Sequence, residues 1–444
     1  MERTNSQRIQ IPEGEIPDVE VTKKDSLDYP LSHYYIQGSH NTYLLGNQLI
    51  GPSTIDGYRQ AIESGCRCIE LDLHNGRTEP VIYHSHTLTG RILAREVIQY
   101  GIRPYFKTND LPLILSMDDH ITKGEQRLHF IQDLRNILGD FLYYTDIQEM
   151  KELPSPNNLR GKIIIKAHRE KWGDLVNICQ VVPFSEDSLV TDVSSNEGNC
   201  FKISSLSEHK LKGLITPSIR EMLSGNKNSV EVRMQRLRDL TKKQLIRYYP
   251  GAQRQMSGNF DPIPGMNSGC QIAAMNVQTK CRHYAIYQSR FREYGSTGFA
   301  LKPAFLLNAD APSIGTQRII IKVIEGQNLL PPNKKTDLFV SVSVEGIKQD
   351  KIEKKTKKSK TNGKTTEWNE QIKFDVTCPE LDFILIRVKT SKYFGLKNST
   401  IGLYSIPVTE MVNGMSYVPL CDPFLNKQPG TSLCIEVKIE DIKK

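Results

Sequence analysis

The sequence lacks a long apolar run, a secretory signal and a strong charge of either sign. No stretch approaches the roughly 18 consecutive apolar residues that a membrane-spanning helix needs. The N-terminus begins Met1-Glu2-Arg3-Thr4 and stays polar and acidic, which does not fit a cleavable signal peptide. The net charge of +8 is too small to indicate nucleic-acid binding. We therefore expect a cytoplasmic protein without a nucleic-acid partner.

The nine cysteines form no recognisable disulfide framework. They are odd in number and scattered along 444 residues, a distribution typical of reduced thiols in the cytosol. Cys66 and Cys68 have the spacing of a metal-ligand pair, but a strand with alternating faces explains them better. The chain also contains no evident internal repeat or low-complexity tract.

Composition leaves enough apolar material for two or three domains. The chain has 38% hydrophobic and 24% charged residues, which is ordinary for a globular protein. Residues 1–28 contain proline and acidic residues with little periodicity, and we expect a flexible leader there.

From about residue 30 to 305, β-branched runs of strand length alternate with segments whose apolar residues recur at helical spacing. After a first strand at 34–36, strands are predicted at 67–73, 80–84, 111–117, 161–166, 175–182, 199–204, 244–249 and 270–278, with helices at 54–65, 90–102 and 125–139. Such alternation indicates a parallel sheet buried on both faces. About eight strands in one domain favour a TIM-type (β/α) barrel, with a doubly wound open sheet as the alternative.

The pattern changes after a short linker around Asp310-Ala311-Pro312. Residues 314–444 contain alternating strands without helices, such as "RIIIKVIEG" and "LFVSVSVEG", and predict an all-β sandwich. A cluster of lysines from Lys348 to Lys364 lies between two of the predicted strands.

Polar residues gather where the barrel strands are expected to end. Taken in chain order, these residues are His40 and Asn41, Glu70 and Asp72, His84, Asp118, and Lys166 and His168. In a barrel, side chains at the carboxyl ends of successive strands project into one site. Glu70 and Asp72, two residues apart, lie on one strand face, where burying both carboxylates without a cation would be costly.

This set of residues has a definite chemistry. An asparagine oxygen and three carboxylates are hard oxygen ligands suited to Ca²⁺ or Mg²⁺. Two histidines beside them can exchange protons near neutral pH. Lys166 and Arg247 supply positive charge suited to holding phosphates. Together the residues indicate metal-assisted phosphodiester chemistry.

The motifs resemble those of one family, the eukaryotic phosphoinositide-specific phospholipases C. The resemblance is carried by "PLSHYYIQGSHNTYLLGNQL", "GCRCIELDLHNG", "PVIYHSHTLTGRI", "LPLILSMDDH", "GKIIIK", "IRYYPGAQR", "GCQIAAMNVQT" and "GFALKPAFL". It implies an X half of a catalytic barrel at 29–170, a Y half at 171–307 and a C2 domain at 314–444. The resemblance includes no pleckstrin-homology or EF-hand module.

The resemblance also implies roles for single residues. His40 and His84 match the two catalytic histidines, and Asn41, Glu70, Asp72 and Asp118 match the Ca²⁺ ligands. Lys166, His168, Ser207, Arg247 and Tyr249 fall where the family contacts the inositol phosphates. In the family reaction the inositol 2-hydroxyl attacks phosphorus, diacylglycerol leaves, and water opens a cyclic inositol phosphate. Glu70 would take the hydroxyl proton, His84 would protonate the leaving oxygen, and His40 would stabilise the charge of the transition state.

Four features depart from the family. Asp118 stands where Glu is usual, and we expect Asp119 or a water to fill the gap. His168 replaces a lysine. The rim of the site keeps Leu49, Leu88 and Leu214 but has fewer aromatic residues. Only "REKWG" separates the two halves, where relatives insert a long acidic linker.

The C2 segment departs as well, since its loop at 389–400 contains no aspartate and only Asp337 remains in the first loop. We therefore expect weak dependence of this domain on Ca²⁺, with the lysine cluster attracting an anionic membrane instead. The expected function is Ca²⁺-dependent hydrolysis of phosphatidylinositol 4,5-bisphosphate and related lipids by a cytoplasmic, peripheral membrane enzyme. The alternative is a catalytically inactive phosphoinositide-binding scaffold. The sequence does not indicate which protein, if any, activates this chain.

Overall fold

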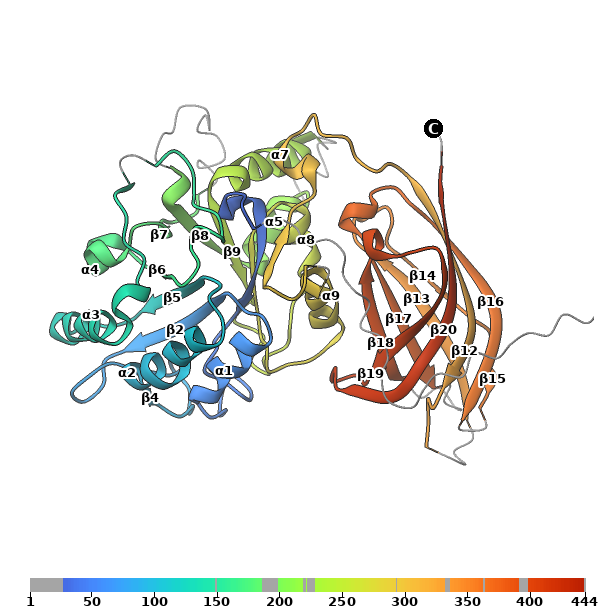
Figure 1. Cartoon of the computed structure of the whole chain (residues 1–444), viewed down its shortest axis with the longest axis horizontal. Helices are drawn as coiled ribbons and strands as arrows, with labels where there is room; N and C mark the ends of the chain where they lie inside the picture. Colours follow the sequence, from blue (N-terminus) through green and yellow to red (C-terminus); the bar gives the residue numbers. More distant parts are fainter. Residues whose placement is uncertain are drawn as a thin grey trace, which may run out of the picture.

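Two β structures follow one another along the chain, a ring of parallel strands and an antiparallel sandwich (Figure 1). The structure is a computed structural model. It describes residues 27–147, 150–185, 199–218, 221, 228–292, 294–331, 336–361, 364–390 and 398–442. The leader expected over 1–28 lies outside these residues, apart from Leu27 and Asp28. No helix in this part of the chain is both long enough and apolar enough to cross a bilayer.

The ring is a barrel whose strands are paired in chain order. Its parallel strands within the described residues are β1 (Tyr34–Ser39), β2 (Cys68–His74), β5 (Leu113–Asp119), β6 (Ile163–Lys166), β7 (Gln180–Val181), β8 (Lys202–Ser207), β9 (Leu245–Tyr249) and β10 (Ile272–Met275). Strand β10 pairs back with β1, so the ring closes. The step from β6 to β7 is a single bridge between Ala167 and Gln180. The predicted barrel is confirmed, and the alternative of an open sheet is wrong.

Helices cover the outside of the barrel and bury its strands on both faces. The longer ones are α1 (Ile55–Glu63), α3 (Gly124–Leu138), α5 (Glu208–Ile215), α7 (Asn228–Lys243) and α9 (Arg282–Arg292), and the short ones are α2 (Ala94–Glu96), α4 (Arg169–Trp172), α8 (Ile263–Asn267) and α10 (Ala304–Leu307). Helix α1 begins where the Thr54 hydroxyl accepts a hydrogen bond from the Gly57 amide at 3.1 Å. Its buried face presents Tyr58, Ala61 and Ile62 to the strands.

Two predicted strands differ in the structure. The strand expected at 175–182 shrinks to β7, because Gly173–Leu175 form a 3₁₀ turn. The Asn177 amide also bonds the carbonyls of Tyr143 and Asp174, which holds this segment in a loop. The strand expected at 80–84 is only β3 (Val81–Ile82), which forms an antiparallel ribbon with β2 and β4 (Ile92–Leu93).

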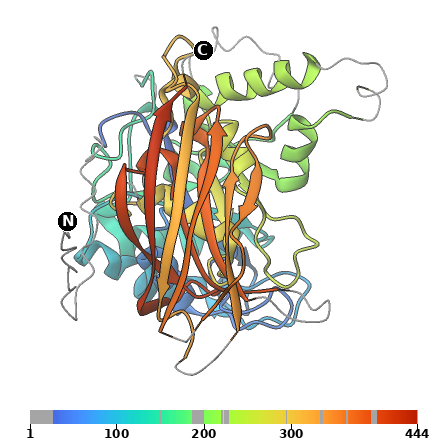
Figure 2. The same ribbon diagram turned by 90° about the vertical axis from the view of Figure 1, so that its right-hand side faces the viewer.

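The second part is an antiparallel sandwich. Its strands are β12 (Gln317–Gln327), β13 (Asp337–Glu345), β14 (Ile352–Lys355), β15 (Ser359–Lys360), β16 (Thr365–Val376), β17 (Phe383–Thr390), β18 (Ser399–Pro407), β19 (Gly414–Cys421) and β20 (Lys427–Asp441). Side chains such as Val340, Ile386 and Phe374 fill the space between its sheets. Figure 2 shows these long strands in front of the barrel, with α7 at one edge.

The barrel and the sandwich are joined through α9. One buried cluster includes Tyr287 and Phe291 of that helix together with Leu381, Phe383 and Leu385 of the sandwich. The Arg290 guanidinium lies 4.6 Å from the centre of the Phe383 ring and donates to the Glu380 carbonyl at 3.0 Å. Shared apolar burial and these polar contacts join the two parts, and we expect them to unfold together.

We expect Phe383→Ala to uncouple the two parts. Replacing a buried phenylalanine by alanine lowers the free energy of unfolding by about 3–5 kcal/mol. At Phe383 the lost packing lies between the barrel and the sandwich. Calorimetry should show one unfolding transition for the unaltered protein and two for the variant. Phe374→Ala, in the interior of the sandwich, is the control and should destabilise the sandwich without removing its contact with α9. A single transition in Phe383→Ala at the original temperature would contradict the prediction.

Candidate active site

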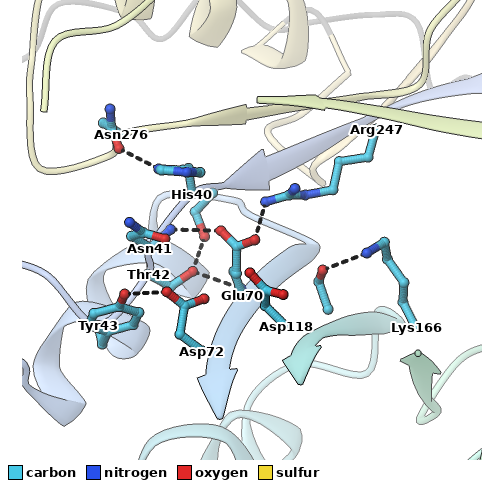
Figure 3. A network of polar contacts seen from close by, with 12 residues as sticks. His40, Asn41, Thr42, Tyr43, Glu70, Asp72, Asp118, Lys166, Arg247 and Asn276 are labelled. Carbon is cyan, nitrogen blue, oxygen red and sulfur yellow. Dashed lines mark hydrogen bonds and ion pairs between the residues drawn. The ribbon is translucent and has the colours of Figure 1, made fainter. Parts of the chain in front are cut away.

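The predicted site residues converge at the carboxyl end of the barrel. His40 and Asn41 directly follow β1, and Glu70 and Asp72 belong to β2. Asp118 lies on β5 opposite Asp72 in the strand register. Figure 3 shows the carboxylates between His40 and Asn41 on one side and Arg247 and Lys166 on the other.

Three carboxylates form a tight acidic group. Glu70, Asp72 and Asp118 each offer one oxygen, and these oxygens all lie within 4.8 Å of one another. Glu70 and Asp72 are buried, whereas 55% of the Asp118 side chain is exposed at the mouth. Burial, followed by the charges of Glu70 and Asp118, raises the pKa of Asp72 well above its usual range. A cation in this position would relieve the mutual repulsion.

The hydrogen bonds leave oxygens available for such a cation. The Arg247 guanidinium donates to Glu70 Oε1 at 2.6 Å, and the Asn41 amide N–H donates to Glu70 Oε2 at 2.9 Å. The Tyr43 hydroxyl donates to Asp72 Oδ2 at 2.5 Å. Asp72 Oδ1 is buried and has no donor among the described residues. An unsatisfied buried carboxylate oxygen beside two other carboxylates fits a metal ion of the hard, oxygen-binding kind.

Both histidines are held through the same ring nitrogen. His40 Nδ1 lies 3.0 Å from the side-chain oxygen of Asn276, and His84 Nδ1 lies 2.8 Å from the carbonyl oxygen of Gln48. Because oxygens of this kind only accept, each Nδ1 carries a proton and each Nε2 is left for chemistry. Burial, aided by the charge of Arg247, lowers the pKa of His40. The neutral form of His40 is therefore favoured, although the charge of Glu70 acts in the opposite direction.

Gln48 and Asn276 are positioning residues that the sequence reasoning missed. The Gln48 amide accepts from Asn41 Nδ2 at 2.5 Å and donates to the Ser257 hydroxyl at 2.8 Å, while its backbone carbonyl holds His84. One residue thus connects a candidate metal ligand to a candidate catalytic histidine. Asn276 could have been found, because it directly follows β10, as the other site residues follow their strands. Gln48 lies in a loop that has no periodic pattern.

The cationic side of the site comes from both halves of the barrel, with Lys166 on β6 and Arg247 on β9. Arg247 lies with its guanidinium carbon 5.4 Å from the centre of the Tyr249 ring, which in turn stacks parallel to His40. Lys166 is buried and donates to the Ser116 hydroxyl at 3.0 Å. Burial, together with the charge of Arg247, lowers the pKa of Lys166. Lys166 and Arg247 thus bring two positive charges close together. Their mutual repulsion favours an anion beside them.

Ser207 and His168 lie further out. Ser207 is paired with Tyr249 in the strand register and caps α5, where its hydroxyl accepts from the Lys210 amide at 3.2 Å. His168 precedes α4, and its Nδ1 lies 3.3 Å from a carboxylate oxygen of Glu170. The structure therefore does not bring His168 into the polar network around Glu70, as far as the described residues go.

Two sequence expectations about this region are wrong. Asp119 does not supplement Asp118, because its carboxylate is bound by Arg127 at 2.8 Å and by the Trp172 indole at 3.1 Å on the opposite face of β5. Leu214 does not belong to the exposed rim, because it is 4% exposed within the barrel core.

The other two rim residues are exposed as expected. Leu88 is 85% exposed, and its amide bonds the carbonyl of Leu49 at 2.9 Å, which joins the two rim loops. Ile50 and Met256 are also exposed on neighbouring loops. The mouth of the barrel therefore has an apolar border.

Comparisons with known proteins agree with this geometry. The family model of the phosphatidylinositol-specific phospholipase C X domain matches residues 27–169, and that of the Y domain matches residues 172–305. A C2-domain model matches residues 317–419. The chain belongs to the phosphatidylinositol-specific phospholipase C family. Only residues 170 and 171 lie between the X and Y matches.

Relatives in this family differ in activity. The chain is 32% identical over 472 residues to 1-phosphatidylinositol 4,5-bisphosphate phosphodiesterase delta-3-A of Danio rerio, covering 92% of this chain and 57% of that protein. It is 33% identical over 439 residues to inactive phospholipase C-like protein 2 of Mus musculus, covering 88% and 38%. The solved structure of PLC21 from S. officinalis matches with a TM-score of 0.80 at 27% identity, covering 95% and 57%. The chain thus spans less than two thirds of these relatives.

A divalent cation should stabilise the metal-free protein, because it binds the native acidic group and not the unfolded chain. With Ca²⁺ as the probe at 100 times its dissociation constant, the free energy of unfolding should rise by about 2.7 kcal/mol. Asp72→Asn should remove most of this gain in a calorimetric measurement. Asp375→Asn, which alters an exposed ion pair with Arg318 on the sandwich, should keep it. An equal gain in both variants would place the ion elsewhere.

Proposed function

We propose that this chain is an active, Ca²⁺-dependent phosphodiesterase of phosphatidylinositol 4,5-bisphosphate and related phosphoinositides. One observation carries the proposal: Asp72 Oδ1, without a donor among the described residues, lies in a three-carboxylate group beside two histidines that present Nε2. An inactive scaffold has no need to keep this arrangement.

Asn41, Glu70, Asp72 and Asp118 would hold the Ca²⁺. Their oxygens are of the type that this ion prefers, and the raised pKa of Asp72 reflects the charge that an ion would balance. When bound, the ion favours ionisation of the inositol 2-hydroxyl and offsets negative charge at phosphorus.

Proton transfer falls to residues of the chain. Glu70 is placed to take the proton of the 2-hydroxyl, while Arg247 balances its charge at 2.6 Å. His84 keeps one proton on Nδ1, bound to the Gln48 carbonyl. In its protonated form His84 carries the second proton on Nε2, from which that proton can pass to the leaving glycerol oxygen.

His40 stabilises charge in its protonated form. Burial favours the neutral ring, but the negative phosphodiester favours protonation when it binds. Since Nδ1 is fixed on Asn276, the added proton must go to Nε2, where it can donate to a phosphate oxygen. Lys166, Arg247, Tyr249, Ser207 and His168 remain the proposed contacts for the ring phosphates.

The alternative is a phosphoinositide-binding scaffold without catalysis, and the likeness to an inactive relative of Mus musculus favours it. A turnover assay on phosphatidylinositol 4,5-bisphosphate vesicles separates the two. Lipid binding without turnover at any Ca²⁺ concentration would establish the scaffold, and turnover that stops with chelator would establish the enzyme.

We expect His40→Ala and His84→Ala each to lose turnover. Loss of proton transfer alone lowers the rate about 10²–10⁴-fold, and loss of charge stabilisation adds to this. The readout is kcat on vesicles under saturating Ca²⁺, with circular dichroism as a check of folding. His129→Ala, on the exposed surface of α3, is the matched control and should keep normal turnover. Normal turnover in both site variants would refute the catalytic assignment.

We also propose that the chain acts as a peripheral protein on anionic membranes, through part of the lysine cluster. The structure divides this cluster. Lys351 lies 3.2 Å from Glu345 and 3.7 Å from Asp261 of the barrel, and the Lys354 ammonium donates to the carbonyl of Lys373 at 2.5 Å. These two lysines therefore serve contacts within the protein.

Three lysines of the cluster that lie close together in the chain are available for a membrane. Lys357, Lys358 and Lys360 are exposed and form no ion pair with a carboxylate of the described residues. They lie between β14 and the end of β15, at the edge of the sandwich. The expectation about Ca²⁺ concerned two loops of the sandwich, the one at 389–400 and the one that contains Asp337. Residues 391–397 and 332–335 of these loops lie outside the described residues. Weak Ca²⁺ dependence of this domain stays a prediction.

Replacing Lys357, Lys358 and Lys360 together by glutamine should weaken binding to phosphatidylserine vesicles. Each cation near an anionic leaflet contributes about 1 kcal/mol, so we expect a loss of roughly 100-fold. Vesicle sedimentation at two salt concentrations measures the effect. The double variant Lys351→Gln, Lys354→Gln is the control and should lose far less. Equal losses in the two variants would show that the surface charge acts without regard to position.

A further inference from the structure

The junction between the X and Y halves is a folded element that contacts Asp119, the residue next to a candidate metal ligand. Residues 169–172 form α4, and Gly173, with a positive φ of 59°, ends it and turns the chain into the next 3₁₀ turn. Trp172 is 1% exposed and packs edge-on against Phe130 of α3 with ring centres 6.2 Å apart. The junction is thus anchored in the core of the barrel.

The Trp172 indole donates to the residue next to a candidate ligand. Its Nε1 lies 3.1 Å from Asp119 Oδ2, and Asp119 directly follows Asp118 on β5. Because successive side chains of a strand point to opposite faces, Asp118 faces the acidic group while Asp119 faces the covering helices. A constraint on Asp119 is therefore a constraint on the backbone that carries Asp118.

Both oxygens of the Asp119 carboxylate accept hydrogen bonds from the protein. Arg127 Nε donates to Oδ2 at 2.8 Å, and the Ile121 amide donates to Oδ1 at 2.9 Å. Arg127 also bonds the Ile121 carbonyl, so one guanidinium holds both the strand end and the chain that leaves it. The carboxylate is 4% exposed, and charge-assisted bonds in such a buried place are strong.

The position of α4 in the barrel makes this anchor important. Strand β6 and strand β7 meet through the Ala167–Gln180 bridge and the bond from the Val181 amide to the Ala167 carbonyl. The neighbouring step from β5 to β6 pairs four residues on each side, from Leu113–Ile163 to Ser116–Lys166. Among the described residues, the β6–β7 step is as sparsely paired as the β1–β2 step, which also has a single register pair, and the junction helix occupies the β6–β7 step.

We propose that Trp172 is a positioning residue for Asp118, so that the X–Y junction of this chain sets the affinity of the acidic group for its cation. The inference rests on the proposed function, since it assumes that Asp118 is a metal ligand. Asp118 has a short side chain and a contact with only His120 at 3.4 Å among the described residues. The position of the Asp118 carboxylate in the site therefore depends on the position of the backbone at the end of β5.

The test is direct measurement of Ca²⁺ binding to the whole chain by calorimetric titration, without substrate. Trp172→Phe keeps an aromatic ring against Phe130 and removes the N–H donor. Asp119→Asn keeps the size of the side chain and removes its charge. Loss of an outer partner of a metal ligand typically weakens binding about 10–100-fold, and we expect the lower end for both variants.

The matched control is Trp368→Phe, the same change at the other tryptophan of the chain. The Trp368 indole donates to the Leu338 carbonyl at 3.3 Å inside the sandwich, far along the chain from the site. All titrations are done well below the unfolding temperature of each variant. A purely structural role for Trp172 would lower that temperature but leave the Ca²⁺ affinity as in the control.

The outcomes separate the inference from the function on which it rests. Weaker Ca²⁺ binding in Trp172→Phe and Asp119→Asn, with normal binding in Trp368→Phe, supports the inference. Should Trp172→Phe not fold, Asp119→Asn alone decides in the same way. Normal binding in the folded variants overturns the inference and leaves the proposed function standing. Absence of Ca²⁺ binding in the unaltered protein overturns both.

Discussion

The site depends on a buried ion pair that crosses the barrel. Glu70 comes from the X half and Arg247 from the Y half, and their charged atoms are 2.6 Å apart with both side chains almost fully buried. Removing one partner of such a pair typically costs about 3–5 kcal/mol, because the other charge is left without compensation. Asn41, Asp72 and Asp118 are arranged around Glu70 and, like it, come from the X half. The Y half contributes Arg247, whose charge compensates that of the buried Glu70.

Much of this arrangement could be read from the sequence because it follows strand periodicity. Glu70 and Asp72 share a face since they are two residues apart, and His40, Asp118 and Lys166 occur at strand ends in barrel order. The same rule fails where tertiary contacts decide. Asp119 or a water was expected to fill the gap beside Asp118, but strand alternation turns Asp119 outward toward Arg127 and Trp172. Gln48 was not predicted because a loop has no periodic pattern.

The sandwich shows a similar division between what pattern predicts and what contacts decide. Alternating apolar residues predicted its strands, and the lysine cluster was visible as a run of like charge. Which of these lysines contact other residues of the protein could not be predicted, because Lys351 pairs with Asp261, a residue of the barrel 90 positions earlier in the chain. The long-range contact pairs one charge of the cluster with a carboxylate and adds one link between the two parts.

The partners of the two histidines have a consequence for control. In many acid–base sites a carboxylate beside the imidazole raises its basicity in advance. Here the partners are an amide oxygen of Asn276 and a backbone carbonyl of Gln48, which carry no charge. Burial lowers the pKa of His40, although the charge of Glu70 acts in the opposite direction. On the proposed mechanism, the anionic lipid headgroup adds negative charge beside His40, so the substrate itself favours protonation of the side chain that stabilises its transition state.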